Sequence, residues 1–324
     1  MAELSQHRHI VFMLASFVLG SLIGSFLNVV IVRLPEGQSI VHPRSRCPNC
    51  HDQIPAWLNV PILSWLILRG RCRACRTPIS ARYPFVELLT GALYAAAFAQ
   101  FDLTLAMLAV IVMGSGLIAI TFIDLDCWEI PDEISLPLIV VGAVLRPFAL
   151  HVSWYDGLVG AVLGATFLWL VRWLFWVLRR IEGMGLGDVK LIAMIGAFVG
   201  PSGTLQTILV ASVAGTFLGV LFIAGRRWGL WGADEATQPE AGAAPDHDDS
   251  NSNSDSDSDS DSDRKDVDEK DAEEEEDWTP HPRAIPFGPF LALGALSHVF
   301  LGRIINHTLS IATLTLDRWL TSLL

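Results

Sequence analysis

The stretch LTLAMLAVIVMGSGLIAITFIDLD, residues 103–126, places 21 uncharged residues directly before the acidic pair Asp124 and Asp126. Such a run is about as long as an α-helix needs to cross the hydrocarbon core of a bilayer. The whole chain of 324 residues agrees, with 52% hydrophobic residues, 17% charged residues and a mean hydropathy of +0.44. Soluble domains carry roughly 25% charged residues. The sequence therefore predicts an all-α, polytopic membrane protein.

Apolar runs of similar length recur along the chain. We expect about eight transmembrane helices, over residues 10–32, 84–101, 103–123, 134–150, 157–178, 188–201, 204–225 and 285–302. The first run is too long for a secretory signal and lacks a small-residue cleavage site, so we expect no cleavable signal. Residues 308–324 are either a ninth segment or an amphipathic tail, and the sequence leaves both open.

Arginines predict the orientation of these spans. Seven lie in the loop of residues 34–83 after the first span, and the pairs at 179–180 and 226–227 fall on the same side when the spans are counted. Cytoplasmic loops carry an excess of Lys and Arg. Both termini are then expected outside the cytoplasm, and Asp124 and Asp188 are expected together at cytoplasmic helix ends.

The net charge of −12 comes from one segment. Residues 233–277 hold 20 acidic and three basic residues, so the remainder holds 14 acidic and 19 basic residues. The segment includes an Asp-Ser repeat and a run of four glutamates. Its composition cannot bury enough apolar surface to fold, so we expect disorder over 233–284. Nothing in the chain indicates nucleic-acid binding.

Four of the five cysteines form two Cys-x-x-Cys pairs in the loop after the first span: Cys47, Cys50, Cys72 and Cys75. Two such pairs are typical of a tetrahedral structural zinc site, and a cytoplasmic location keeps thiols reduced. A redox pair or idle thiols remain the alternatives. His51 is a competing ligand by position, although a spare loop histidine is the simpler interpretation. Cys127 has no Cys-x-x-Cys partner.

Asp124 and Asp188 are the main catalytic candidates. A carboxylate at membrane depth is costly and marks a functional site by default, and two converging carboxylates suit proton sharing and water activation. Asp188 follows Gly183, Gly185 and Gly187, which leave the backbone free for positive φ and for close approach of a peptide. Helix capping is the alternative for Asp188, and it suits Asp132 better than catalysis does. A solvated neighbour is the alternative for Asp126.

The order of motifs resembles the type IV prepilin peptidases, which are membrane aspartic proteases. The resembling stretches are GSFLNVVIVRLP (24–35), ISARYPFVELLTG (79–91), IDLDCWEIPD (123–132), GMGLGDVKL (183–191) and IPFGPFLA (285–292), with the four-cysteine loop between the first two. The resemblance implies a first helix (1–33), a cysteine loop with methyltransferase function (34–83), a peptidase core (84–232) and a C-terminal segment (285–324), and composition places the acidic insert (233–284) between the last two.

By this resemblance Asp124 and Asp188 form the catalytic pair, and Gly185, Gly187 and Glu87 are candidates for substrate binding. The implied activity is cleavage of the leader of prepilins or pseudopilins at the cytoplasmic face of the inner membrane. N-methylation by S-adenosylmethionine, linked to the zinc loop, is implied next. An ion pair with Arg82 is the alternative for Glu87. The resemblance does not name the prepilin or the oligomeric state.

Other functions remain open at this point. A transporter would use the same carboxylates to relay protons or bind cations, although such sites lie nearer mid-membrane. A catalytically inactive scaffold for pilus or secretion assembly is the second alternative. The long acidic insert departs from the family pattern. We hypothesise that it attracts basic leaders, an effect that salt would weaken.

Overall fold

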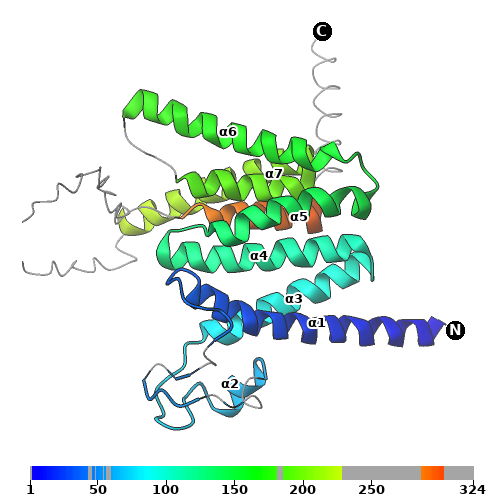
Figure 1. Ribbon diagram of the computed structural model, residues 1–324, viewed down its shortest axis with the longest axis vertical. Coiled ribbons are helices and arrows are strands. Elements are labelled where there is room, and N and C mark those ends of the chain that lie inside the picture. The colour runs from blue at the N-terminus through cyan, green and yellow to red at the C-terminus, as the bar shows by residue number, and fades with distance from the viewer. Residues whose placement is uncertain are drawn as a thin grey trace, which may run out of the picture. The chain divides into compact units, whose positions relative to one another are not determined.

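The computed structural model describes residues 2–42, 46–47, 49–53, 55, 60–180, 185–227 and 286–302, and Figure 1 shows its helices. Within these residues the regular elements are helices, and β-structure is limited to two isolated bridges. The helices are α1 (Ala2–Arg33), α2 (Leu63–Ile67), α3 (Arg82–Phe101), α4 (Leu105–Cys127), α5 (Asp132–Leu150), α6 (Tyr155–Arg179), α7 (Leu186–Arg227) and an unlabelled helix at Gly288–Gly302. The all-α prediction is confirmed.

All eight predicted spans fall on helices. Among the described residues, six helices are long and apolar enough to cross a membrane: α1, α3, α4, α5, α6 and α7. The predicted spans 188–201 and 204–225 are joined in α7, and the predicted span 285–302 is the shorter helix Gly288–Gly302. The protein is therefore a multi-pass membrane protein.

Helix α7 is a hairpin of two helices. At Gly200 the backbone leaves helical geometry, with φ 72° and ψ −176°, and Pro201 follows. Positive φ favours glycine because it has no Cβ, and proline starts a helix well because its fixed φ suits the first helical position. Figure 1 shows the start of α7 at the end of the helix bundle where α4 ends.

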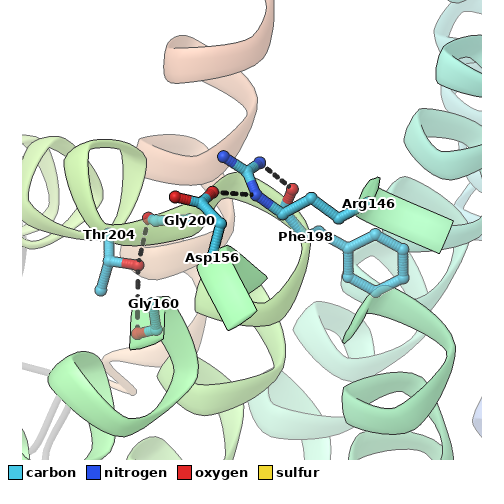
Figure 2. A network of polar contacts seen from close by, with 6 residues as sticks. All are labelled: Arg146, Asp156, Gly160, Phe198, Gly200 and Thr204. Atoms are coloured by element: carbon cyan, nitrogen blue, oxygen red, sulfur yellow. Dashed lines mark hydrogen bonds and ion pairs between the residues drawn. The ribbon is translucent and has the colours of Figure 1, made fainter. Parts of the chain in front are cut away.

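Polar contacts close the other end of this hairpin (Figure 2). The Arg146 side chain, from α5, is only 8% exposed. Its Nε donates to Asp156 Oδ2 at 2.6 Å, and its Nη1 donates to the Phe198 carbonyl at 2.7 Å. A side chain at Gly200 would collide with Arg146 and Asp156. Buried charges are tolerated when they are paired in this way.

The bundle has two main apolar clusters. One joins α4, the first half of α7 and the helix Gly288–Gly302, through Leu117, Leu191, Ile195 and Leu291. The other joins α1, α3 and α4, through Ile31, Val86 and Ile123. Helix α4 contributes to both clusters, so it packs against α1 and α3 in one cluster and against α7 and the helix Gly288–Gly302 in the other.

The segment Leu221–Ala284 separates from the rest of the chain as a second unit. The predicted acidic insert (233–284) and the predicted ninth segment or tail (308–324) lie outside the described residues. Disorder of the insert and the nature of the tail therefore stay predictions.

Candidate active site

Asp124 lies in the last turn of α4 and is only 5% exposed. Its Oδ2 accepts a 3.0 Å hydrogen bond from the backbone N–H of Gly288. Helix α4 ends at Trp128, which takes the left-handed conformation and donates its N–H to the Asp124 carbonyl at 3.1 Å. The side chain and the backbone carbonyl of Asp124 therefore each accept a hydrogen bond from a main-chain N–H.

Asp188 lies in the first turn of α7 and is partly buried. The residue before it, Gly187, packs closely against Ile130, which follows the end of α4, and Gly288 lies close to both Asp124 and Leu191, one turn after Asp188. The structure thus brings the two predicted carboxylates together from helices that are distant in sequence. Two acids in such a site cannot both ionise freely, so they are suited to share a proton.

The other acids near this pair have cationic partners. The Asp126 carboxylate pairs with the guanidinium of Arg82 at 2.5 Å. Asp132 accepts two hydrogen bonds from Lys190 Nζ, at 2.7 and 2.8 Å. Asp132 occupies the first turn of α5, where its charge suits the helix dipole as predicted, whereas Pro131 holds the N-cap position, so Asp132 is not the cap itself. Asp126 is likewise an ion-pair partner.

Gly185 and Gly187 do not take the positive φ that the sequence allows, whereas their role in substrate binding stays a prediction. Gly187 lies within the first turn of α7 and does not take positive φ. A side chain there would press on Ile130, with a Cβ–Cβ distance of 3.0 Å, so Gly187 is required for close packing. Gly185 is exposed and has room for a side chain. Gly183 lies outside the described residues.

Glu87 is buried at 8% exposure on α3. Its carboxylate accepts the backbone N–H of Ile62 at 2.7 Å and also bonds to Ser25. The alternative of an Arg82 partner is wrong because Arg82 pairs with Asp126 instead. Ile62 has a φ of 62°, which is rare for a β-branched residue and marks local strain. Glu87 therefore anchors a strained turn of the cysteine loop onto α3.

Glu87 also lines a cavity of about 560 Å³ between α1, the cysteine loop and α3. The lining mixes aromatic groups, acids, bases and amides, among them Asn28, Arg33, Asp52, Trp65, Tyr83 and Glu87. Small-molecule sites are typically ~300–1,000 Å³ and combine apolar walls with a few polar groups. The cavity is therefore large enough for a cofactor-sized ligand.

The four predicted metal ligands converge. The Sγ atoms of Cys47, Cys50, Cys72 and Cys75 all lie within 4.8 Å of one another. Two Sγ pairs are 3.7 and 3.9 Å apart. Zn–S bonds of about 2.3 Å in a regular tetrahedron put the sulfurs about 3.8 Å apart. The donor set therefore fits a zinc ion, and His51 is not part of it.

The two halves of this cluster have the same local structure. In the first, Cys47 and His51 close a turn at 2.9 Å. In the second, Cys72 and Arg76 do so at 3.1 Å. The residue after each second cysteine has positive φ, 56° at His51 and 62° at Arg76. An isolated bridge flanks each turn. These are two matched knuckles around one centre.

Hydrogen bonds favour the thiolate at two of the four cysteines, whereas at Cys50 burial and the neighbouring thiols outweigh the backbone hydrogen bond from Asp52 and raise the pKa to about 12. A hydrogen bond from the Thr77 hydroxyl lowers the pKa of the Cys75 thiol to about 5. The backbone N–H of Cys50 lowers the pKa of Cys47. Thiolate is the form that binds metal.

These features define a multi-pass helical membrane protein with a carboxylate pair at helix ends and a four-thiol centre in the loop between α1 and α3. Residues 18–101 match the bacterial peptidase A24 N-terminal domain, and residues 111–220 match the type IV leader peptidase family. This chain belongs to the type IV leader peptidase family.

Three similar proteins carry the name prepilin leader peptidase/N-methyltransferase. The protein from Myxococcus xanthus (strain DK1622) is 38% identical over 305 residues, covering 88% of this chain and 89% of its own. That from Burkholderia pseudomallei (strain 1026b) is 41% identical over 231 residues, covering 64% and 75%. That from Stutzerimonas stutzeri is 43% identical over 235 residues, covering 65% and 81%. No solved structure matches this chain.

Proposed function

We propose that this protein cleaves the leader peptide of type IV prepilins or pseudopilins and then methylates the new N-terminus. The similarity to proteins named for both activities, over most of both chains, supports the proposal. The observation that supports its peptidase half is that Gly288 donates its N–H to Asp124 and also lies close to Leu191, one turn after Asp188.

The peptidase step follows from two carboxylates that share a site. One ionised carboxylate accepts a proton from a water molecule, and the other, protonated, donates to the carbonyl oxygen of the scissile bond. The proton then passes to the leaving amine, and the carboxylates exchange roles. Because the pair titrates as a unit, an observed pH dependence belongs to both residues. Asp124 and Asp188 are the residues to which we assign this chemistry.

For the methylation half, we assign the cavity beside the cysteine loop to S-adenosylmethionine. Trp65 and Tyr83 offer aromatic surface to an adenine ring, and Glu87 offers negative charge to a cationic donor. The methyl group would pass to the free α-amine of the cleaved pilin, which loses a proton as S-adenosylhomocysteine forms. Glu87 and the cysteine knuckles shape this cavity.

The four cysteines would hold one Zn²⁺ as a structural ion. Since sulfur fills all four positions, the metal has no open site for a substrate. The described part of the loop has little apolar burial, with no buried residue in α2. The ion would therefore supply much of the free energy that folds the loop.

We place the protein in the bacterial inner membrane, with its active site at the cytoplasmic face. The arginine-rich loop of residues 34–83 supports this orientation, because positive loops stay in the cytoplasm. In Figure 1, α1 and α4 end and α3 and α7 begin at the same end of the bundle, and Asp124, Asp188 and the cysteine loop belong to these helix ends. Substrates of this site are helices that enter the membrane next to a basic leader.

One reaction tests both halves. The purified protein in detergent is incubated with a prepilin and S-adenosylmethionine labelled in its methyl group, and leader loss and label transfer are followed by mass spectrometry. We expect cleavage first and label only on the cleaved product. Retention of cleavage by both Asp124→Ala and Asp188→Ala would exclude the peptidase assignment. A transporter or an inactive scaffold would give neither product.

A further inference from the structure

The helix Gly288–Gly302 begins at the active site. Its first residue donates a backbone N–H to Asp124 Oδ2 at 3.0 Å, across a separation of 164 residues. We propose that Gly288 is a positioning residue, whose amide fixes the Asp124 carboxylate for peptide cleavage. This inference rests on the proposed peptidase function.

The amide of Gly288 is available because of its place in the helix. The first N–H groups of a helix have no carbonyl partner in the same helix. Here the next turn closes on Phe287, whose carbonyl accepts from Phe290 at 3.1 Å and from Leu291 at 3.2 Å. The Gly288 N–H points instead to Asp124, where the partial positive charge of the helix start also attracts a carboxylate.

Glycine is required at this position by proximity. A Cβ added at Gly288 would collide with Asp124 Oδ2 and would lie 3.5 Å from Leu191 Cδ2. Gly288 has no positive φ, so conformational freedom does not select it. Glycine permits the backbone to reach the carboxylate.

The same turn contacts both catalytic helices. Leu191 lies three residues after Asp188 on α7, and it is fully buried. Leu291 and Phe290 belong to the same apolar cluster as Leu191, which holds the helix Gly288–Gly302 against α7. The Gly288 turn is therefore wedged between the helix of Asp124 and the helix of Asp188. It sets the carboxylate of one relative to the other.

The two carboxylate oxygens of Asp124 therefore have different roles. Oδ2 is held by the amide, which fixes the plane of the carboxyl group and leaves Oδ1 to serve the water or the shared proton. Misplacing a catalytic group by about 1 Å costs on the order of 100-fold in rate. A side chain at Gly288 must move Asp124 or the helix start by a similar amount.

The test is Gly288→Ala, with Gly219→Ala as the matched control because a Cβ at Gly219 meets nothing within 4 Å. Steady-state cleavage of a prepilin is measured for both variants and the wild type. Methyl transfer to a pilin supplied without its leader is measured in the same samples, as a check on folding. We expect Gly288→Ala to lower kcat by on the order of 100-fold, with KM changed by less than about threefold, and to keep methyl transfer. Gly219→Ala should match the wild type.

Equal kcat for Gly288→Ala and wild type would overturn the inference while leaving the peptidase function intact. A rise in KM alone would also overturn it, since that indicates lost substrate binding instead of lost positioning. If methyl transfer falls with cleavage, a double variant with Asp124→Glu decides. Its longer side chain should recover part of the cleavage if the carboxylate is misplaced, and recovery of none refutes the positioning role. Failure of the wild type to cleave any prepilin would count against the proposed function itself.

Discussion

Replacement of Cys75 by serine should empty the metal centre. The Sγ distances of 3.7 and 3.9 Å bracket the value of about 3.8 Å for a tetrahedral Zn²⁺–thiolate site, so all four cysteines are placed to bind at once. Structural zinc contributes apparent binding free energies of about 10–16 kcal/mol in small zinc-binding peptides. Cys75 is also the thiol whose pKa is lowered to about 5 by the Thr77 hydroxyl, so it binds as a ready thiolate.

Loss of one thiolate weakens the site and loosens the loop that borders the 560 Å³ cavity. Methyl transfer should therefore fall with the metal. Leader cleavage should persist, because Asp124 and Asp188 are held by α4, α7 and the helix Gly288–Gly302. Cys127→Ser is the matched control, since Cys127 is exposed and outside the cluster.

The assay measures zinc per chain by mass spectrometry of the metal after dialysis against a mild chelator, together with both activities. We expect about one zinc in the wild type and in Cys127→Ser, and a loss of most of it in Cys75→Ser. Full zinc occupancy in Cys75→Ser, or loss of zinc in Cys127→Ser, would refute the four-thiolate site.

Three further predictions follow from local geometry. His51→Gly should keep the metal and raise the stability of the zinc loop by up to about 1 kcal/mol, because glycine relieves the positive φ. Slower transfer of zinc to a chelator would report this gain. Loss of the metal would instead show that His51 is a ligand. Gly200→Ala should lower the free energy of unfolding by at least about 1–2 kcal/mol relative to Gly219→Ala, because the added Cβ at position 200 strains the backbone and meets Arg146. An unchanged melting temperature would contradict this. Glu87→Gln keeps a hydrogen-bond acceptor for the backbone N–H of Ile62 but removes the negative charge. The KM for S-adenosylmethionine should therefore rise about tenfold, or about 1.4 kcal/mol, while cleavage stays unaltered. An unchanged KM would rule out an ionic role for Glu87.

Much of this architecture is predictable from sequence. Apolar runs located the helices, and counting them from the arginine-rich loop put Asp124 and Asp188 on one side of the membrane. Cysteine spacing alone predicted the knuckles, because a two-residue gap is a local geometric constraint. These signals depend on the order of residues along the chain and on the length of a membrane span.

The contacts around the site were less accessible. The Gly288–Asp124 hydrogen bond links residues 164 positions apart, and its only sequence signal was the motif IPFGPFLA, which named no role. The closeness of Arg82 and Glu87 in the sequence suggests an ion pair. Residues that are five apart on a helix point in different directions, however, whereas residues that are three or four apart are neighbours on its surface. The sequence allowed positive φ at Gly187, but the glycine packs closely against Ile130 without positive φ, and this contact depends on the folded chain.

The central claim is that the carboxylates of Asp124 and Asp188 together cleave the leader. The most direct measurement is the rate of leader release by Asp124→Asn and Asp188→Asn, with Asp126→Asn as the matched control. Asp126 lies two residues from Asp124 and is paired with Arg82 outside the buried site. We expect Asp124→Asn and Asp188→Asn each to lose cleavage by several orders of magnitude and still to methylate a pilin supplied without its leader. Asp126→Asn should cleave at close to the wild-type rate. Wild-type cleavage by either Asp124→Asn or Asp188→Asn would contradict the central claim.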